Sequence, residues 1–260
     1  MVELILLFLG LAIGSFLGAV SYRLPRGKQF LTGRSRCPRC GKTIAGYDNI
    51  PLFSYLILKG RCRHCRQRIS LRYPAIEAAT APLFVSTYWV FASCTGPSPI
   101  CAWRDILGPA SLPFLLLVMA LVVLVFIIDF EKQIIPDELS FLGFGATSAL
   151  LLFGGDNIFL RLFSGILVSF FLLSVHLVTR GKGMGLGDVK FALFAGVFFG
   201  WPMGLIWLFT AFLTGAAVAI ILILTGKAGR RDKIAFGPFL AIAFVIVAFW
   251  GDKILSAILL

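Results

Sequence analysis

The chain alternates long apolar stretches with short polar connections. A helix needs about 20 predominantly apolar residues to cross the hydrocarbon core of a bilayer. Apolar stretches of this kind lie at about 2–22, 74–92, 108–128, 138–154, 158–178, 188–200, 203–225 and 234–250. The pattern therefore predicts an all-α polytopic membrane protein with about eight transmembrane helices, the sixth of them short.

Composition excludes a soluble protein. Hydrophobic residues make up 59% of the 260 positions and charged residues only 14%, whereas soluble domains average about 25% charged residues. The first apolar stretch is not expected to be a removable signal peptide. Glu3 precedes it, it has no basic region ahead of it, and its positive charges follow it.

The basic residues predict how the chain is oriented in the membrane. Residues 23–72 hold thirteen Lys and Arg against one acid, Asp48. Further basic residues fall in the other loops of the same side, at positions 132, 180, 182, 227, 230, 231 and 233. Lys and Arg accumulate in cytoplasmic loops, so we expect this side to be cytoplasmic and the N-terminus to lie outside. The net charge of +12 is then mainly a topology signal that also attracts anionic lipids, and no nucleic-acid partner is expected.

The loop between the first two apolar stretches carries two Cys-x-x-Cys pairs. Cys37 and Cys40 form the first pair, and Cys62 and Cys65 form the second, 21 residues later. Two such pairs can supply the four thiolates of a tetrahedral Zn²⁺ site, whose closed coordination shell makes it structural rather than catalytic. Disulfides are the simpler alternative, but they do not persist in a reducing cytoplasm. His64 is a less favoured replacement for one of the thiolates.

Two further cysteines, Cys94 and Cys101, fall on the opposite side of the predicted membrane. A disulfide between them is plausible if that compartment is oxidising, and two free thiols are the equal alternative.

Ionisable residues at the ends of apolar stretches are candidates for function because charge is costly there. Asp129 ends the third stretch and Asp188 opens the sixth. The predicted topology puts both at the cytoplasmic face. Two carboxylates brought together in a low-dielectric site cannot easily both ionise, so one can act as a general base for water and the other as an acid. Asp188 follows the segment GMGLG, whose glycines, Gly183, Gly185 and Gly187, permit close backbone approach. They could form a wall beside which a substrate helix is unwound.

Simpler interpretations of these acids stay open at this point. Asp137, after Pro136, has the position of an ordinary helix N-cap. Asp188 could also cap a helix, and Asp129 could be an interfacial charge.

Six ordered segments together resemble the type IV prepilin peptidase family, the prepilin leader peptidase/N-methyltransferases of the GxGD type. The resemblance covers nearly the whole chain. The segments are GSFLGAVSYRLPRG, SRCPRC with DNIP, SYLILKGRCRHC, ISLRYPAIE, IIDFEKQIIPD and GMGLGD. One departure is Gly18, followed by Ala19, where family members often carry Asn.

The resemblance implies a bifunctional enzyme of the bacterial inner membrane. Such an enzyme removes the basic leader of prepilins or pseudopilins after a glycine, at the cytoplasmic face, and then N-methylates the new terminus with S-adenosylmethionine. The catalytic aspartates fall on Asp129 and Asp188, with Asp137 in a supporting role. The family's four cysteines fall on Cys37, Cys40, Cys62 and Cys65. The glycine and basic residue linked to methyl transfer fall on Gly60 and Arg61.

The expected organisation has three parts. Residues 1–22 form the first transmembrane helix, 23–73 a zinc-binding region associated with methyl transfer, and 74–260 the membrane-embedded peptidase. Two other functions stay open. One is a peptidase without methyl transfer, and the other is an ion-coupled carrier that uses Asp129 and Asp188 as ion sites. A carrier is expected to show internal inverted repeats, and none is visible.

Overall fold

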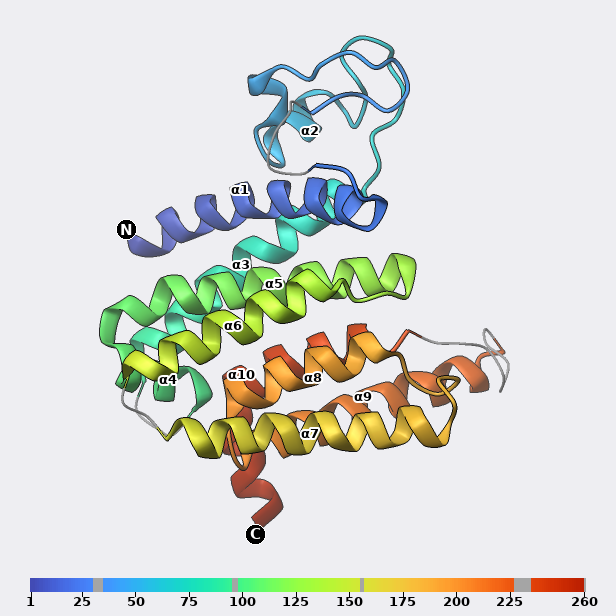
Figure 1. Ribbon diagram of the computed structural model, residues 1–260. Coiled ribbons are helices and arrows are strands. Elements are labelled where there is room, and N and C mark those ends of the chain that lie inside the picture. The colour runs from blue at the N-terminus through green and yellow to red at the C-terminus, as the bar shows by residue number, and fades with distance from the viewer. Residues whose placement is uncertain (30–34, 95–97, 155–156, 227–234, 260) are drawn as a thin grey trace. The chain divides into compact units, whose positions relative to one another are not determined.

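A computed structural model of the protein describes residues 1–29, 35–94, 98–154, 157–226 and 235–259, and within them nearly all regular structure is helical (Figure 1). These residues contain no β-strand, only isolated bridges between Arg36 and Thr43 and between Arg61 and Arg68. Arg34 and the basic residues at 227, 230, 231 and 233 lie outside the described residues. The chain divides into two compact units, Met1–Trp89 and Val90–Leu260.

The first unit is built on two long helices, α1 (Val2–Arg23) and α3 (Arg72–Ala92). Glycines let their backbones touch: a Cβ added at Gly10 would lie 2.6 Å from the Cα of Ala81, and one at Gly14 would lie 2.8 Å from the Cα of Glu77. Small residues are the usual means by which helices approach closely in membranes. The two apolar segments therefore form a tight helical pair.

In the connection between α1 and α3, the described residues form the short helix α2 (Phe53–Ile57) and single 3₁₀ turns. The connection is tied to the helical pair by a buried carboxylate. The carboxylate of Glu77, on α3, is buried and accepts a hydrogen bond of 2.8 Å from the backbone N–H of Leu52. The two helices are also joined to each other, because the guanidinium of Arg72, on α3, donates to the carbonyl of Gly18, on α1, at 3.0 Å.

The described residues of the second unit form seven α-helices. They are α4 (Pro99–Leu107), α5 (Ser111–Lys132), α6 (Asp137–Gly154), α7 (Ile158–Val178), α8 (Leu186–Phe199), α9 (Met203–Leu224) and α10 (Gly237–Leu259). Helix α8 is the most enclosed of them. The aromatic rings of Phe194 and Phe198, on α8, pack against Phe244 of α10 with centroid distances of 5.8 and 4.9 Å, and all three side chains are fully buried.

The C-terminal end of α8 is capped by side chains from two other helices. The carbonyl of Phe198 accepts hydrogen bonds from the indole N–H of Trp103 at 3.1 Å and from the guanidinium of Arg161 at 2.8 Å. The last carbonyls of a helix have no partner within the helix, and in an apolar environment each unpaired group costs several kcal/mol. These two donors therefore allow α8 to end inside the unit after 14 residues.

Helices lie at all eight of the predicted apolar stretches, but six helical segments of the described residues are long and apolar enough to cross a membrane. The two that fall short are α6, which carries Asp137 and Glu138 in its first turn, and α8. The all-helical prediction is confirmed, and eight spans are not. Helix α5 also continues to Lys132, so Asp129 lies within its last turn rather than just beyond the helix.

Candidate functional site

Asp129 occupies a buried position in the last turn of α5. Only 5% of the residue is exposed, and its Oδ2 accepts a hydrogen bond of 2.9 Å from the backbone N–H of Gly237, at the start of α10. Helix α5 ends at Gln133, whose left-handed backbone (φ 55°) lets its N–H bond back to the carbonyl of Asp129 at 2.8 Å. The helix therefore ends within one turn of the Asp129 carboxylate.

Asp188 lies in the first turn of α8 and is also buried, with 8% of the residue exposed. Its Oδ2 accepts a hydrogen bond of 3.0 Å from the backbone N–H of Gly185, the residue that precedes the helix. A carboxylate that accepts an unpaired N–H at a helix N-terminus is a capping interaction. Asp188 thus caps the helix, as one interpretation of the sequence predicted. The same carboxylate also lines a cavity.

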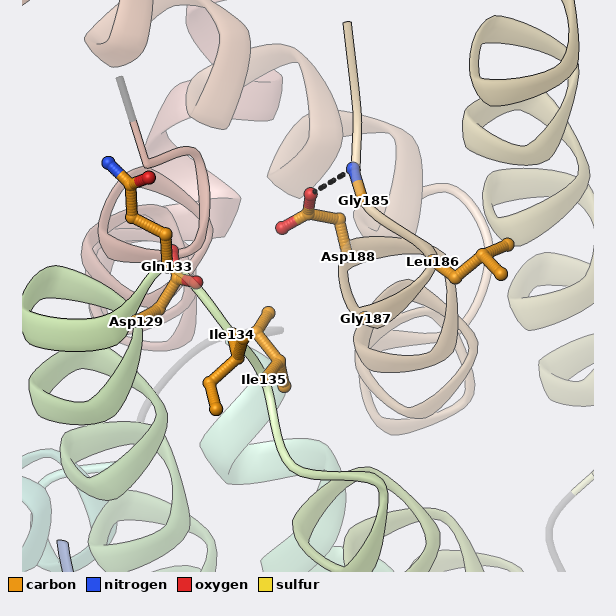
Figure 2. Close-up of a pocket in the computed structure, with 8 residues that line it drawn as sticks. All are labelled: Asp129, Gln133, Ile134, Ile135, Gly185, Leu186, Gly187 and Asp188. Carbon is orange, nitrogen blue, oxygen red and sulfur yellow. Dashed lines mark hydrogen bonds between the residues drawn. The ribbon is translucent and has the colours of Figure 1, made fainter. Parts of the chain in front are cut away.

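The two acids line one cavity of about 240 Å³ (Figure 2). The other lining residues come from the connection between α5 and α6 and from the start of α8: Gln133, Ile134, Ile135, Gly185, Leu186 and Gly187. In Figure 2 the carboxylate of Asp188 points from α8 towards the side of the cavity on which Asp129 and Gln133 lie. Residues 59 positions apart in the sequence are thus brought to one site, as expected for the pair.

The glycines before Asp188 have separate roles. Gly187 packs on the connection between α5 and α6, where an added Cβ would lie 3.0 Å from the Cβ of Ile135 and 3.3 Å from its backbone N and O. Gly185 has room, since an added Cβ would meet only the Asp188 carboxylate at 3.4 Å. Gly183 lies away from the cavity against Thr179, whose hydroxyl accepts its N–H at 3.1 Å. Gly185 and Gly187 therefore border the cavity, whereas Gly183 packs against Thr179, so the prediction that all three glycines form one wall is wrong for Gly183.

Asp137 does not line the cavity. It is the first residue of α6, and its carboxylate forms an ion pair of 2.6 Å with the ammonium of Lys190 on α8. Both side chains are partly exposed. Asp137 therefore lies at the start of a helix, as predicted, but its side chain pairs with a residue of a neighbouring helix.

The four cysteines of the first unit form a compact group. The Sγ atoms of Cys37, Cys40, Cys62 and Cys65 all lie within 4.8 Å of one another, and those of Cys37 and Cys65 are 3.8 Å apart. A tetrahedron with Zn–S bonds of about 2.3 Å has S–S edges of about 3.8 Å. The arrangement thus fits one Zn²⁺ held by four thiolates, and His64 is not among the residues of this group.

The two cysteine pairs have the same local geometry. Backbone N–H groups of Cys37 and Cys62 donate to the carbonyls of Lys42 and Gln67 at 3.0 and 2.8 Å. Gly41 and Arg66, one residue after each pair, both have left-handed backbones with φ of 69° and 59°. A hydrogen bond from the Cys40 backbone helps to lower the pKa of the Cys37 thiol to about 7, which favours the thiolate form that binds metal.

Gly60 and Arg61 lie directly before the second cysteine pair. Gly60 has a left-handed backbone (φ 66°), and an added Cβ would come within 2.8 Å of the hydroxyl oxygen of Tyr55. A side chain at this position would be strained by the backbone and would displace the tyrosine. The local structure therefore favours glycine at position 60. This is separate from the association with methyl transfer that the resemblance implies.

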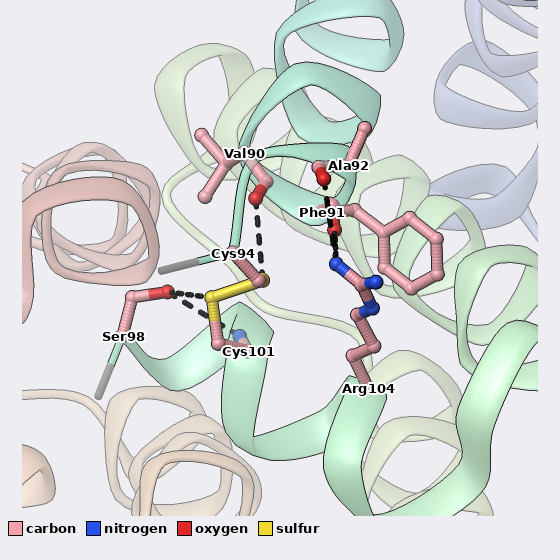
Figure 3. Close-up of a disulfide and its surroundings, with 7 residues drawn as sticks. All are labelled: Val90, Phe91, Ala92, Cys94, Ser98, Cys101 and Arg104. Atoms are coloured by element: carbon pink, nitrogen blue, oxygen red, sulfur yellow. Dashed lines mark hydrogen bonds between the residues drawn. A yellow bond between two sulfur atoms is a disulfide. The ribbon is translucent and has the colours of Figure 1, made fainter. Parts of the chain in front are cut away.

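Cys94 and Cys101 form a disulfide in the second unit (Figure 3). It ties the residues after α3 to the first turn of α4, where Ser98 accepts the N–H of Cys101 at 3.3 Å. The guanidinium of Arg104 donates to the carbonyl of Phe91 at 2.8 Å and adds a second link between the same segments. Of the two alternatives open from the sequence, the disulfide is the one found.

The sequence interpretation missed the polar residue Gln133 and the backbone donor Gly237, as well as the apolar lining residues Ile134, Ile135 and Leu186. Gln133 lines the cavity, and Gly237 donates to Asp129. The segment FGPFL, at 236–240, did carry a signal. A glycine and a proline directly before an apolar run are typical of a helix start.

Comparison with known proteins gives a consistent result along the chain. Residues 8–91 match the model of the bacterial peptidase A24 N-terminal domain, and residues 115–220 match that of the type IV leader peptidase family. The chain is 38% identical to the prepilin leader peptidase/N-methyltransferase of Aeromonas salmonicida, over 97% of this chain and 91% of that protein. It is 34% identical to the protein of the same name from Pseudomonas aeruginosa, over 95% and 90% of the two chains. No solved structure matches the chain.

Proposed function

The chain belongs to the type IV leader peptidase family, and from this premise we propose that it is a bifunctional enzyme of the bacterial inner membrane. It removes the basic leader peptide of prepilins or pseudopilins with an aspartate pair, Asp129 and Asp188. It then N-methylates the residue that becomes the new N-terminus. The lipid bilayer and the prepilin are its partners.

One observation carries the peptidase assignment: two buried carboxylates from different helices line the same cavity. Each carboxylate has one oxygen held by a glycine N–H, Asp129 by Gly237 and Asp188 by Gly185. Two carboxylates that are held in place at one cavity and can share a proton are the arrangement that aspartic peptidases require. An acid that served only as a helix cap would not need a second buried acid facing the same cavity.

The chemistry follows from one proton shared by the pair. The ionised carboxylate takes a proton from a water molecule in the cavity, and the water oxygen bonds to the carbonyl carbon of the scissile peptide. The protonated carboxylate gives its proton to the carbonyl oxygen. When the tetrahedral intermediate collapses, the C–N bond breaks and the leaving nitrogen takes a proton from the carboxyl group formed in the first step. The hydroxyl that becomes the new carbonyl returns its proton to the other carboxylate, which restores the starting pair. The pair titrates as one unit through this cycle.

The proposed topology has eight spans. Six are the segments that are long and apolar enough to cross a membrane, and α6 and α8 are the other two. The N-terminus lies outside, and both aspartates lie at the cytoplasmic face. The thirteen basic residues of 23–72 support this orientation. The Cys94–Cys101 disulfide also supports it, because disulfides persist on the oxidising side of the membrane.

The region 23–73 is proposed to bind one structural Zn²⁺ through Cys37, Cys40, Cys62 and Cys65. The sulfur separations support this assignment. The connection has little apolar core of its own, so the metal would supply part of its folding free energy. Residues 1–22 form the first transmembrane helix, and residues 74–260 form the peptidase. Methyl transfer needs S-adenosylmethionine as donor, and Gly60 and Arg61 are proposed to act in this half of the activity.

A peptidase without methyl transfer and an ion-coupled carrier are the two alternatives. Co-expression of this protein with a prepilin tests all three, with the size of the prepilin followed on a gel and its N-terminus by mass spectrometry. The proposal predicts a shortened product whose first residue carries one added methyl group. A shortened product without the methyl group would support the peptidase alone, and an unprocessed prepilin would contradict both enzymatic assignments.

A further inference from the structure

Gly237 lies at the one point where the last helix of the chain meets the aspartate pair. Its backbone N–H donates to Oδ2 of Asp129 at 2.9 Å, a buried hydrogen bond between residues 108 positions apart. Helix α10 begins at this residue. Pro238 follows and has no N–H, while the N–H groups of Phe239 and Leu240 both donate to the carbonyl of Phe236 at 3.0 and 3.2 Å. The N–H of Gly237 is thus the donor that the first turn of α10 presents to the carboxylate.

The approach between the two residues leaves no space for a side chain. A Cβ added at Gly237 would lie 2.5 Å from Oδ2 of Asp129, 2.7 Å from its Cγ and 2.9 Å from its Cβ. All three separations are shorter than real carbon contacts, and Asp129 is enclosed within α5. Any residue other than glycine would therefore push the carboxylate out of its present position or move the start of α10.

We propose that Gly237 is a positioning residue for peptide cleavage. By holding Oδ2, it determines which way the other oxygen of Asp129 faces in the cavity that Asp188 also lines. The inference rests on the proposed function, because it assigns Gly237 a role only if Asp129 takes part in cleavage. It adds a third element, α10, to a site that the two aspartate motifs alone do not complete.

A matching contact supports this role. On the other side of the cavity, the N–H of Gly185 holds Oδ2 of Asp188 at 3.0 Å. Both carboxylates are thus oriented by one backbone N–H at the start of a helix, where the unpaired donors carry partial positive charge. Backbone donors hold a carboxylate more rigidly than long side chains do, since they lose no rotamer freedom. Catalysis is sensitive to the position of such a group, because a displacement of about 1 Å can lower the rate on the order of 100-fold.

The alternative is that Gly237 serves only to pack α10 against α5. The two interpretations differ in what a Gly237→Ala variant loses. A positioning role predicts a lower kcat with little change in KM, and methyl transfer to a pre-cleaved peptide that is close to wild type. A packing role predicts that stability, cleavage and methyl transfer fall together.

The experiment uses the full-length protein purified in detergent and a synthetic prepilin peptide with a basic leader, a glycine and an apolar segment. The matched control is Gly215→Ala on α9, where an added Cβ would meet Phe236 and Phe239 at an ordinary 3.5 Å. We expect Gly237→Ala to lower kcat on the order of 100-fold, with KM within about threefold of wild type, while Gly215→Ala stays close to wild type in both.

The Asp129→Asn variant separates failure of this inference from failure of the proposed function. If Asp129→Asn is inactive but Gly237→Ala cleaves normally, the positioning role is wrong and the aspartate pair stands. If Asp129→Asn still cleaves, the proposed function itself is contradicted.

A second comparison covers the case in which Gly237→Ala is unstable. Removing the side chain of Asp129 in the same chain, as Gly237→Ala with Asp129→Gly, removes all three atoms that the new Cβ would meet. The positioning role predicts that the melting temperature recovers to that of Asp129→Gly alone. Failure to recover would show that the glycine is needed for packing elsewhere, and it would overturn the inference.

Discussion

The ammonium of Lys190 lies 2.6 Å from the carboxylate of Asp137, so an ion pair outside the cavity joins α8, which carries Asp188, to α6, the helix that follows the Asp129 segment. Asp137 begins the helix that follows the Asp129 segment, and Lys190 lies two positions after Asp188. The exposed fractions of the two side chains are 54% and 34%. The pair is therefore placed to align the two segments without touching the substrate cavity.

Asp137→Asn and Lys190→Met are expected to keep cleavage within about tenfold of wild type. Partly exposed ion pairs contribute at most about 1 kcal/mol, much of which solvent screens. Initial rates of leader removal measure this directly. The reversed pair, Asp137→Lys with Lys190→Asp, serves as the control and should recover part of any loss. Complete inactivation by Asp137→Asn would instead give that residue a direct role in the reaction.

Gly187→Ala is expected to lower both stability and cleavage, because the new methyl group would press on Ile135 and widen the space between α8 and the connection before α6. Overpacking of this kind costs about 1–3 kcal/mol. Thermal unfolding and kcat are the measurements. Gly145→Ala, on α6, is the matched control because its added Cβ meets nothing within 4 Å. Equal effects of the two substitutions would contradict the close contact with Ile135.

Gly185→Ala tests the wall that the glycines were predicted to form beside the substrate. An added Cβ at this position meets only the Asp188 carboxylate, at an ordinary distance. We therefore expect unchanged stability and a KM raised several-fold, because the methyl group occupies space beside the acid. A KM equal to that of the wild type would show that the substrate does not approach this side of the cavity.

Cys62→Ser is expected to reduce the zinc content of the purified protein from about one ion per chain to nearly none, since a structural site needs all four ligands. Elemental analysis of the purified protein gives the ratio. Cys94→Ser changes a cysteine outside the group and should leave the zinc unchanged. Retention of a full zinc equivalent by Cys62→Ser would exclude the four-thiolate site.

Replacing Cys94 and Cys101 together by serine is expected to remove two thiols that become reactive only after reduction. The count of maleimide-reactive thiols in denatured protein, with and without reductant, measures this. The short loop that the disulfide closes suggests a loss of about 2 kcal/mol in unfolding free energy. If both cysteines react without reductant in protein isolated from cells, the segment does not lie in an oxidising compartment.

The helical architecture could be predicted from the sequence because apolar length is a direct signal. The same signal does not decide α8, which is helical for only 14 residues and ends where Trp103 and Arg161, from other helices, donate hydrogen bonds to the carbonyl of Phe198. Of the site, the two acids and the four cysteines carried local signals in their motifs. The contact between Gly237 and Asp129 could not be predicted, because it depends on where α10 starts relative to α5 in space. The ion pair between Asp137 and Lys190 depends in the same way on the packing of α6 against α8.

The most direct test of the aspartate pair is the rate of leader removal by purified Asp129→Asn and Asp188→Asn, with Asp137→Asn as the matched control. Asparagine keeps the size of the side chain but can neither take up nor release the proton. We predict that each of the first two variants loses on the order of 1,000-fold or more in rate, with melting temperatures near wild type, and that the control stays active. Cleavage that persists in either of the first two variants would contradict the account.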